Sequence, residues 1–238
     1  MENVPAILSL AFILTTALTG WLFYRAAHCS RPTLYLLLAW LAVQGGVSST
    51  GFYDAPQELP PRLLLALAPA LAVVATLLLT IRGRTYLDGL RLDTLTLLHV
   101  VRIPVELGLL GLCLYKAVPQ LMTFEGRNWD ILSGLSSPII YYLAFKRRKI
   151  GRNSLLVWNL LCLGLLLNVV FYAVLAVPSP VQRFGFEQPN VAVLYFPFVW
   201  LPSCVVPLVL LTHLAAIRQL LRLRLAAKPT ELKRPYLC

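Results

Sequence analysis

Long apolar runs dominate the sequence and predict membrane-spanning helices. A helix needs about 20 predominantly apolar residues to cross the hydrocarbon core of a bilayer. Segments of about this length run without a single Asp, Glu, Lys or Arg at residues 4–24, 33–53, 63–81, 154–177 and 191–217. We therefore expect each of these segments to form a transmembrane helix.

Two further segments complete the predicted bundle. Residues 95–118 are long enough to span but contain Arg102, Glu106 and Lys116, while residues 131–145 are short and begin with small and polar side chains. We include both, because without the second segment the basic loops would fall on opposite sides of the membrane. The predicted fold is all-α, a single domain over residues 1–238 that forms a seven-transmembrane-helix bundle.

The distribution of Lys and Arg predicts the orientation of this bundle. Of 21 basic residues, 16 lie on one side, including the tail at residues 218–238, 4 lie on the other, and Arg102 lies inside the membrane. Cytoplasmic loops carry the excess of Lys and Arg. We therefore expect an outside N-terminus and a cytoplasmic C-terminus, in a plasma or bacterial inner membrane. The basic residues at 146–152 and in the tail also suit contact with anionic lipid headgroups.

Composition supports the membrane class and excludes other classes. The chain is 58% hydrophobic and 13% charged, whereas soluble domains carry roughly 25% charged residues. A net charge of +11 favours nucleic-acid binding in a soluble protein, but the orientation bias explains it here, so we expect no nucleic-acid partner. The cysteines show no CxxC spacing, and the histidines form no zinc motif. We expect neither a metal nor a cofactor, and the last span has no lysine for a retinal Schiff base.

Ionisable residues of the fourth span form the first candidate site. His99, Arg102 and Glu106 share a helix face, within an arc of about 60° at 100° per residue. At a rise of about 1.5 Å per residue, Glu106 lies close to the midplane of the membrane. Pro104 removes a backbone donor inside this stripe and predicts a bend. Ionisable residues inside a membrane are first interpreted as functional.

A structural interpretation of the same residues remains open. Arg102 and Glu106 are four residues apart, a spacing at which opposite charges on a helix neutralise one another. Such a pair would tie the fourth span to polar side chains on neighbouring spans, with Gln44, Ser48 and Asn168 as candidates. In that case the stripe serves packing alone. In the functional interpretation, Gln44 and Asn168 are candidate members of the binding site.

The loop after the fourth span, residues 119–130, forms the second candidate site. We expect four of its polar residues to form the outer lip of a binding cavity: Glu125, Arg127, Asn128 and Asp130. The same loop carries several large apolar residues, which is typical of an interfacial segment. Part of the loop has a structural explanation, since Asn128 or Asp130 suits a helix N-cap and Trp129 suits an aromatic anchor.

Three functions fit these features. The leading hypothesis is a small-solute transporter or ligand-binding membrane protein, in which Arg102 pairs with an anionic group or holds Glu106 ionised, and Glu106 takes up and releases a proton. Its ligand would be small and polar or lipid-like. The alternative is an intramembrane enzyme acting on a lipid or isoprenoid, with Glu106 or His99 as acid or base. The third is a seven-helix receptor or assembly partner without chemistry.

Overall fold

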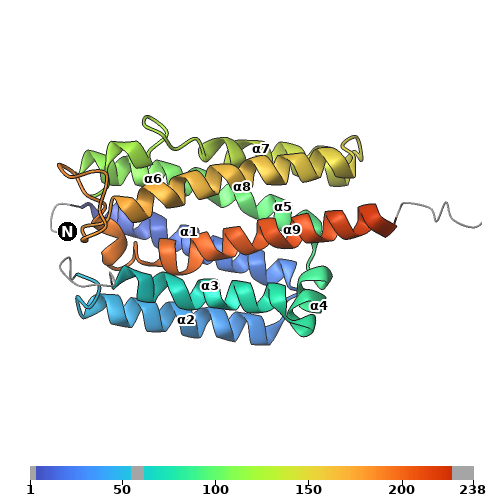
Figure 1. Cartoon of the computed structure of the whole chain (residues 1–238), viewed down its shortest axis with the longest axis horizontal. Coiled ribbons are helices and arrows are strands. Elements are labelled where there is room, and N and C mark those ends of the chain that lie inside the picture. The colour runs from blue at the N-terminus through green and yellow to red at the C-terminus, as the bar shows by residue number, and fades with distance from the viewer. Residues whose placement is uncertain (1–3, 55–61, 227–238) are drawn as a thin grey trace, which may run out of the picture.

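The computed structural model describes residues 4–54 and 62–226, and its long helices lie side by side along one axis (Figure 1). The chain is 75% helical, with no strand in the described ranges. The α-helices are α1 (Ala6–Ala26), α2 (Arg31–Ser49), α3 (Leu63–Leu79), α4 (Ile81–Gly89), α5 (Leu92–Leu98), α6 (Arg102–Leu114), α7 (Ile131–Tyr141), α8 (Arg152–Leu175) and α9 (Val206–Ala226). Short 3₁₀ or π turns are η1 (His99–Val101), η2 (Gln120–Met122), η3 (Tyr142–Lys146), η4 (Ala192–Leu194) and η5 (Leu201–Val205). The basic residues Lys228, Lys233 and Arg234 of the predicted tail lie outside the described residues.

The helices confirm an all-α protein compatible with a membrane. Four helical segments are long and apolar enough to cross a bilayer: Ala6–Ala26, Leu92–Leu114, Arg152–Leu175 and Leu201–Leu223. Helices α3 and α4 together make a fifth candidate, bent by 92° where they meet. Large apolar side chains are exposed on the outer surface of the bundle, among them Leu36, Leu114 and Leu161. Exposed apolar surface of this extent is typical of a face that contacts lipid.

The last predicted span, residues 191–217, begins too early. Residues 191–200 form the short turn η4 and irregular backbone, and the continuous helical segment begins only at Leu201. The early residues are apolar because they pack inside the protein, since the side chains of Ala192, Val193 and Leu194 are buried. Their backbone is held by other loops, with the N–H of Ala192 donating to the carbonyl of Ala117 at 3.1 Å. Buried protein interior and lipid-facing helix look alike in a hydropathy pattern.

The fourth predicted span is deformed where Pro104 predicts it. The segment consists of α5, the 3₁₀ turn η1 and α6. Proline has no N–H to donate to the carbonyl of Val100, and its ring crowds that carbonyl. The tightened turn at His99–Val101 contains Val100 and ends three residues before the proline. Helix α6 begins immediately after this turn, at Arg102.

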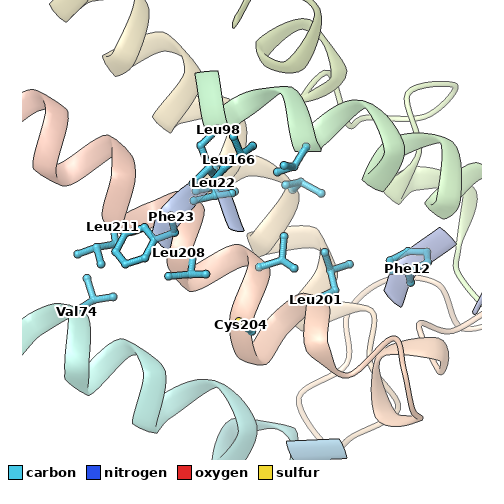
Figure 2. Packing of buried hydrophobic residues seen from close by; sticks show 14 of the residues in the cluster. Phe12, Leu22, Phe23, Val74, Leu98, Leu166, Leu201, Cys204, Leu208 and Leu211 are labelled. Carbon is cyan, nitrogen blue, oxygen red and sulfur yellow. The ribbon is translucent and has the colours of Figure 1, made fainter. Parts of the chain in front are cut away.

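The deformed segment contributes to an apolar core that also includes side chains of α1, α3, α8 and α9 (Figure 2). Leu98 and Val101 are fully buried, and Phe12 of α1 meets Phe198 edge to face with ring centroids 4.9 Å apart. Gly108 of α6 permits this arrangement, because a Cβ atom there would lie 2.5 Å from the Phe12 ring. The core therefore packs closely where α1 meets α6.

A salt bridge at the opposite end of the bundle from the N-terminus gives a pH-dependent prediction. Asp88 of α4 accepts hydrogen bonds from Arg218 Nε at 2.8 Å and Nη2 at 2.9 Å, and it also contacts Arg222. The hydrogen bond from Arg218 is the main reason why the pKa of Asp88 lies below its ordinary value of 3.8. A lowered folded-state pKa stabilises the protein above the unfolded-state pKa, and this contribution disappears as the pH falls through the folded-state pKa.

We expect Asp88→Asn to destabilise the protein by at most about 1 kcal/mol at pH 6, since the arginines are partly exposed. Thermal unfolding of wild type and variant should show this difference at pH 6 and lose it below pH 3.8. A difference that is unchanged at low pH would contradict an ionic origin.

Candidate functional site

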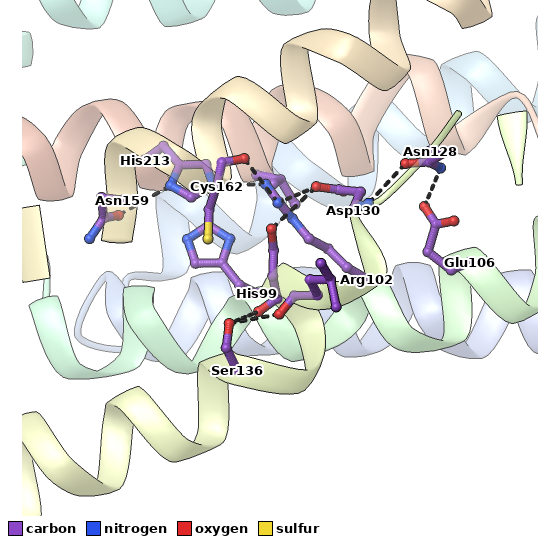
Figure 3. A network of polar contacts seen from close by, with 12 residues as sticks. His99, Arg102, Glu106, Asn128, Asp130, Ser136, Asn159, Cys162 and His213 are labelled. Carbon is purple, nitrogen blue, oxygen red and sulfur yellow. Dashed lines mark hydrogen bonds and ion pairs between the residues drawn. The ribbon is translucent and has the colours of Figure 1, made fainter. Parts of the chain in front are cut away.

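Arg102, the first residue of α6, is the centre of a buried polar network (Figure 3). Its side chain is 3% exposed. One terminal nitrogen, Nη1, donates to Asp130 Oδ1 at 2.5 Å and to the carbonyl of Cys162 at 3.2 Å. The other, Nη2, lies 2.8 Å from His213 Nε2. Arg102 thus joins α6 to the start of α7, to α8 and to α9.

The partners of His213 determine its protonation. An arginine only donates hydrogen bonds, so His213 Nε2 must accept from Arg102 and carries no proton. The proton therefore resides on Nδ1, which lies 3.1 Å from Asn159 Oδ1 and donates to it. His213 is a neutral imidazole in this arrangement.

His99 extends the network toward α5. Its ring stacks on that of His213, with centroids 3.9 Å apart and planes 16° from parallel. The hydroxyl of Thr212 donates to the carbonyl of Val209 at 2.7 Å, so His99 Nε2, at 3.4 Å, donates to that hydroxyl oxygen. His99 Nδ1 then remains an acceptor, and it has no hydrogen-bond partner within residues 4–54 and 62–226.

Glu106 lies at the other end of the network, beside the 119–130 loop. Asn128 Nδ2 donates to Glu106 Oε1 at 2.6 Å and to the carbonyl of Met122 at 2.9 Å. The backbone N–H of Asp130 donates to Asn128 Oδ1 at 3.0 Å. Gly126 makes the tight turn possible, since a Cβ atom there would lie 2.3 Å from the carbonyl oxygen of Gln120. The loop is therefore a shaped structure that holds Asn128 and Asp130 inside the bundle.

Arg102 and Glu106 do not pair with each other in the structure. Each of them contacts a different residue instead. Arg102 pairs with Asp130, and Glu106 bonds with Asn128. Helix α7 comes close enough for this because Gly134 faces Ile103, and a Cβ atom there would lie 2.8 Å from Ile103 Cγ1. Asp130 occupies the N-cap position of α7 but makes no side-chain cap, since its carboxylate faces the guanidinium.

The other predicted site residues lie apart from this network. Glu125 and Arg127 are exposed, and Arg127 donates to the hydroxyl of Tyr172 at 3.2 Å. Asn168 Nδ2 donates to the backbone carbonyl of Arg127 at 2.8 Å, which fixes the loop to α8. Gln44 accepts from the hydroxyl of Tyr53 at 2.7 Å and stabilises the end of α2.

Sequence reasoning missed two members of the network, His213 and Asn159. Both side chains are buried, at 0% and 1% exposure. A signal was present, because each is an isolated polar residue inside a long apolar span, and such residues turn toward protein partners. The hydrogen bond between these two residues could not be identified from spacing, because it is set by the packing of α8 against α9.

A cavity lies against the Arg102, Glu106 and Asp130 side of the network. The space that water-sized spheres can occupy in it is about 80 Å³. Apart from these three residues and Asn190, the lining consists of apolar side chains from α3, α6, α8, η5, α9 and nearby turns. Glu106 Oε2 has no hydrogen-bond partner in the part of the chain that the structure describes. The cavity therefore combines a long apolar wall with a carboxyl group of which one oxygen has no hydrogen-bond partner among the described residues.

The described residues include no group of three or more His, Cys, Asp or Glu side chains placed to hold a metal ion. The chemistry that the network offers is that of one arginine, two carboxyl groups and two imidazoles.

Fold and site together define a helical, membrane-compatible protein with a buried polar network beside an apolar cavity. Residues 60–221 match the family described as a domain of unknown function (DUF8737), and the chain belongs to this family. No curated protein and no solved structure matches the chain. The matched residues run from the start of α3 into α9 and include every member of the network.

Proposed function

We propose that this protein is a seven-span integral membrane protein that binds a small amphiphilic molecule and carries it between sites in the membrane. In this proposal α2 and the α7–η3 segment complete the spans, the N-terminus is outside and the C-terminus is cytoplasmic. The start of α1 and the end of α9 lie at opposite ends of the bundle (Figure 1), which agrees with an odd number of crossings. The basic cytoplasmic face would contact anionic lipid headgroups.

The observation that carries the proposal is the unpartnered oxygen of Glu106 in the wall of an apolar cavity. Buried polar groups in proteins are almost always hydrogen-bonded, and an exception calls for a specific explanation. Small-molecule sites are mostly apolar pockets in which a few polar groups fix the orientation of the ligand. The cavity has this composition, with Glu106 as the group that orients the ligand.

The position of the partly exposed lining residues supports entry from the lipid side. These residues are Leu67 of α3, Val105 of α6, Val170, Ala173 and Val174 of α8, Pro202 of η5 and Val206 of α9. Helices α3 and α8 flank α9 (Figure 1), so the mouth of the cavity would face the hydrocarbon region between them. The π-helical η5 forms part of this wall, and π-helical turns are frequent at functional sites.

A lateral mouth also suits an enzyme acting on a lipid, with Glu106 as acid or base. Binding receives more support than catalysis, because His99, the other candidate base, does not line the cavity. Arg102 is held by Asp130 and His213 and is not free to move toward a reacting group.

Filling the cavity tests the proposal. We expect Ala173→Phe to weaken the binding of decanol at least about tenfold, because the ring occupies the space of the alkyl chain. The affinity is measured from the rise in unfolding temperature with decanol concentration, by intrinsic tryptophan fluorescence. Leu167→Phe on the same helix is the matched control, since Leu167 is 53% exposed and does not line the cavity. Equal binding by wild type and Ala173→Phe would refute the proposal.

A further inference from the structure

No positive charge on the cavity lining is free to balance an ionised Glu106. Arg102 and Asp130 neutralise each other at 2.5 Å, and His213 is neutral because it accepts from Arg102. The lining side chains contributed by α3, α8, η5 and α9 are uncharged. An ionised Glu106 would therefore give the cavity one net negative charge in a region of low dielectric constant, where an unpaired charge is strongly unfavourable.

The unpartnered polar atoms of the cavity are mainly acceptors. Glu106 Oε2 and Asn190 Oδ1 both lack a hydrogen-bond partner within the described ranges. Both residues line the cavity, at 1% and 0% exposure. The orientation of Asn190 is fixed, because its Nδ2 donates to the carbonyl of Ala173 at 3.2 Å. Against these two acceptors stands a single unpartnered donor on a lining residue, Arg102 Nε.

These features identify the chemical class of the ligand. We propose that the cavity binds an amphiphilic ammonium ion, whose N–H groups donate to Glu106 Oε2 and Asn190 Oδ1 while its alkyl chain lies along the aliphatic wall. An ammonium group supplies several donors and no acceptor, and its charge matches the uncompensated carboxylate. The inference rests on the proposed function and makes it more specific.

The charge balance couples binding to proton release. Without a cation, Glu106 is neutral and carries its proton. When the ammonium ion binds, Glu106 becomes a carboxylate and its proton leaves to water. The ammonium ion thus takes the place of the proton, and the net charge of the site does not change. The charged groups that act on Glu106 are Arg102 and Asp130, and their mutual pairing is unchanged by the exchange. A site of this kind can drive the movement of a cation by the movement of a proton in the opposite direction.

The test compares three ten-carbon probes that differ only in their polar group: decylammonium, decanol and decanoate. A primary amine of this kind has a pKa near that of lysine, about 10.4, and stays charged at neutral pH. Using the purified full chain in a neutral detergent, we expect decylammonium to bind about tenfold or more tightly than decanol. Decanoate should bind most weakly of the three. In weakly buffered solution at pH 6, binding of decylammonium should release about one proton per protein, as expected when one neutral carboxyl group becomes a carboxylate.

Glu106→Gln should abolish both the preference for decylammonium and the release of a proton, while keeping the size and shape of the side chain. The variant is expected to bind decylammonium no better than decanol and to release no proton. Glu125→Gln is the matched control, because Glu125 is exposed and does not line the cavity. If Glu106→Gln does not fold, the ranking of the probes and the proton count on wild type decide the question.

The outcomes separate this inference from the proposed function. Decanoate binding more tightly than decylammonium, or an unchanged preference in Glu106→Gln, would overturn the ammonium assignment and leave the ligand-binding function intact. Failure of all three probes to bind wild type would overturn the proposed function itself.

Discussion

Replacing Asp130 by leucine is expected to lower the free energy of unfolding by about 3–5 kcal/mol, because it leaves a buried charge without its partner. Arg102 is 2% exposed and cannot reach water. Its Nη1 would keep only the carbonyl of Cys162. The loss is measured by thermal or denaturant unfolding of the purified protein in detergent.

The double variant Arg102→Met with Asp130→Leu provides the decisive comparison. Replacing both members of a buried ion pair by apolar residues is often neutral, whereas removing one member is not. We therefore expect the double variant to recover most of the stability that Asp130→Leu loses. Glu125→Leu in the same loop should change stability by no more than about 0.5 kcal/mol, since Glu125 is exposed. A loss of less than about 1 kcal/mol in Asp130→Leu would contradict the central position of the pair.

The sequence identified an all-α, membrane-compatible fold and most members of the polar network, but not their pairing. Arg102, Glu106, Asn128 and Asp130 stand out because charged and amide side chains are rare in or next to apolar spans. Their spacing along the helix favoured a contact between Arg102 and Glu106. The structure instead bonds each of them to a residue of the 119–130 loop. The choice depends on how closely α7 approaches α6, which is a property of tertiary packing.

Hydropathy also cannot show whether a segment faces lipid or protein. Residues 191–200 are as apolar as a span, but most of their burial comes from packing in loops at one end of the bundle. Conversely, α2 contains Gln44 and Ser48 and is not among the segments apolar enough to span by length and composition alone. Both side chains are buried and bond to protein partners. They lower the mean hydropathy of α2 but do not lie on its exposed face.

Gly134→Leu is expected to destabilise the protein by about 1–3 kcal/mol through overpacking alone. A Cβ atom at Gly134 would lie 2.8 Å from Ile103 Cγ1 and 3.0 Å from the backbone nitrogen of Ile103. Since backbone cannot yield as a flexible side chain does, α7 must move away from α6. Asp130 lies one helical turn before Gly134, so this movement also lengthens the contact between Asp130 and Arg102. Unfolding in detergent measures the total loss, and Gly164→Leu on α8, where a Cβ atom meets nothing within 4 Å, is the control.

Combining Gly134→Leu with Asp130→Leu separates the two causes. If the glycine serves only local packing, the two losses should add, as expected for independent sites. If close approach of α7 is what places the carboxylate against Arg102, the double variant should lose less than the sum, because each change disrupts the same contact. We expect the loss of stability in the double variant to be smaller than the sum of the two single losses by about 1 kcal/mol or more, within the range seen for coupled residues. Strict additivity would show that the ion pair forms without the close packing of α6 and α7, and would assign the position of Asp130 to the 119–130 loop alone.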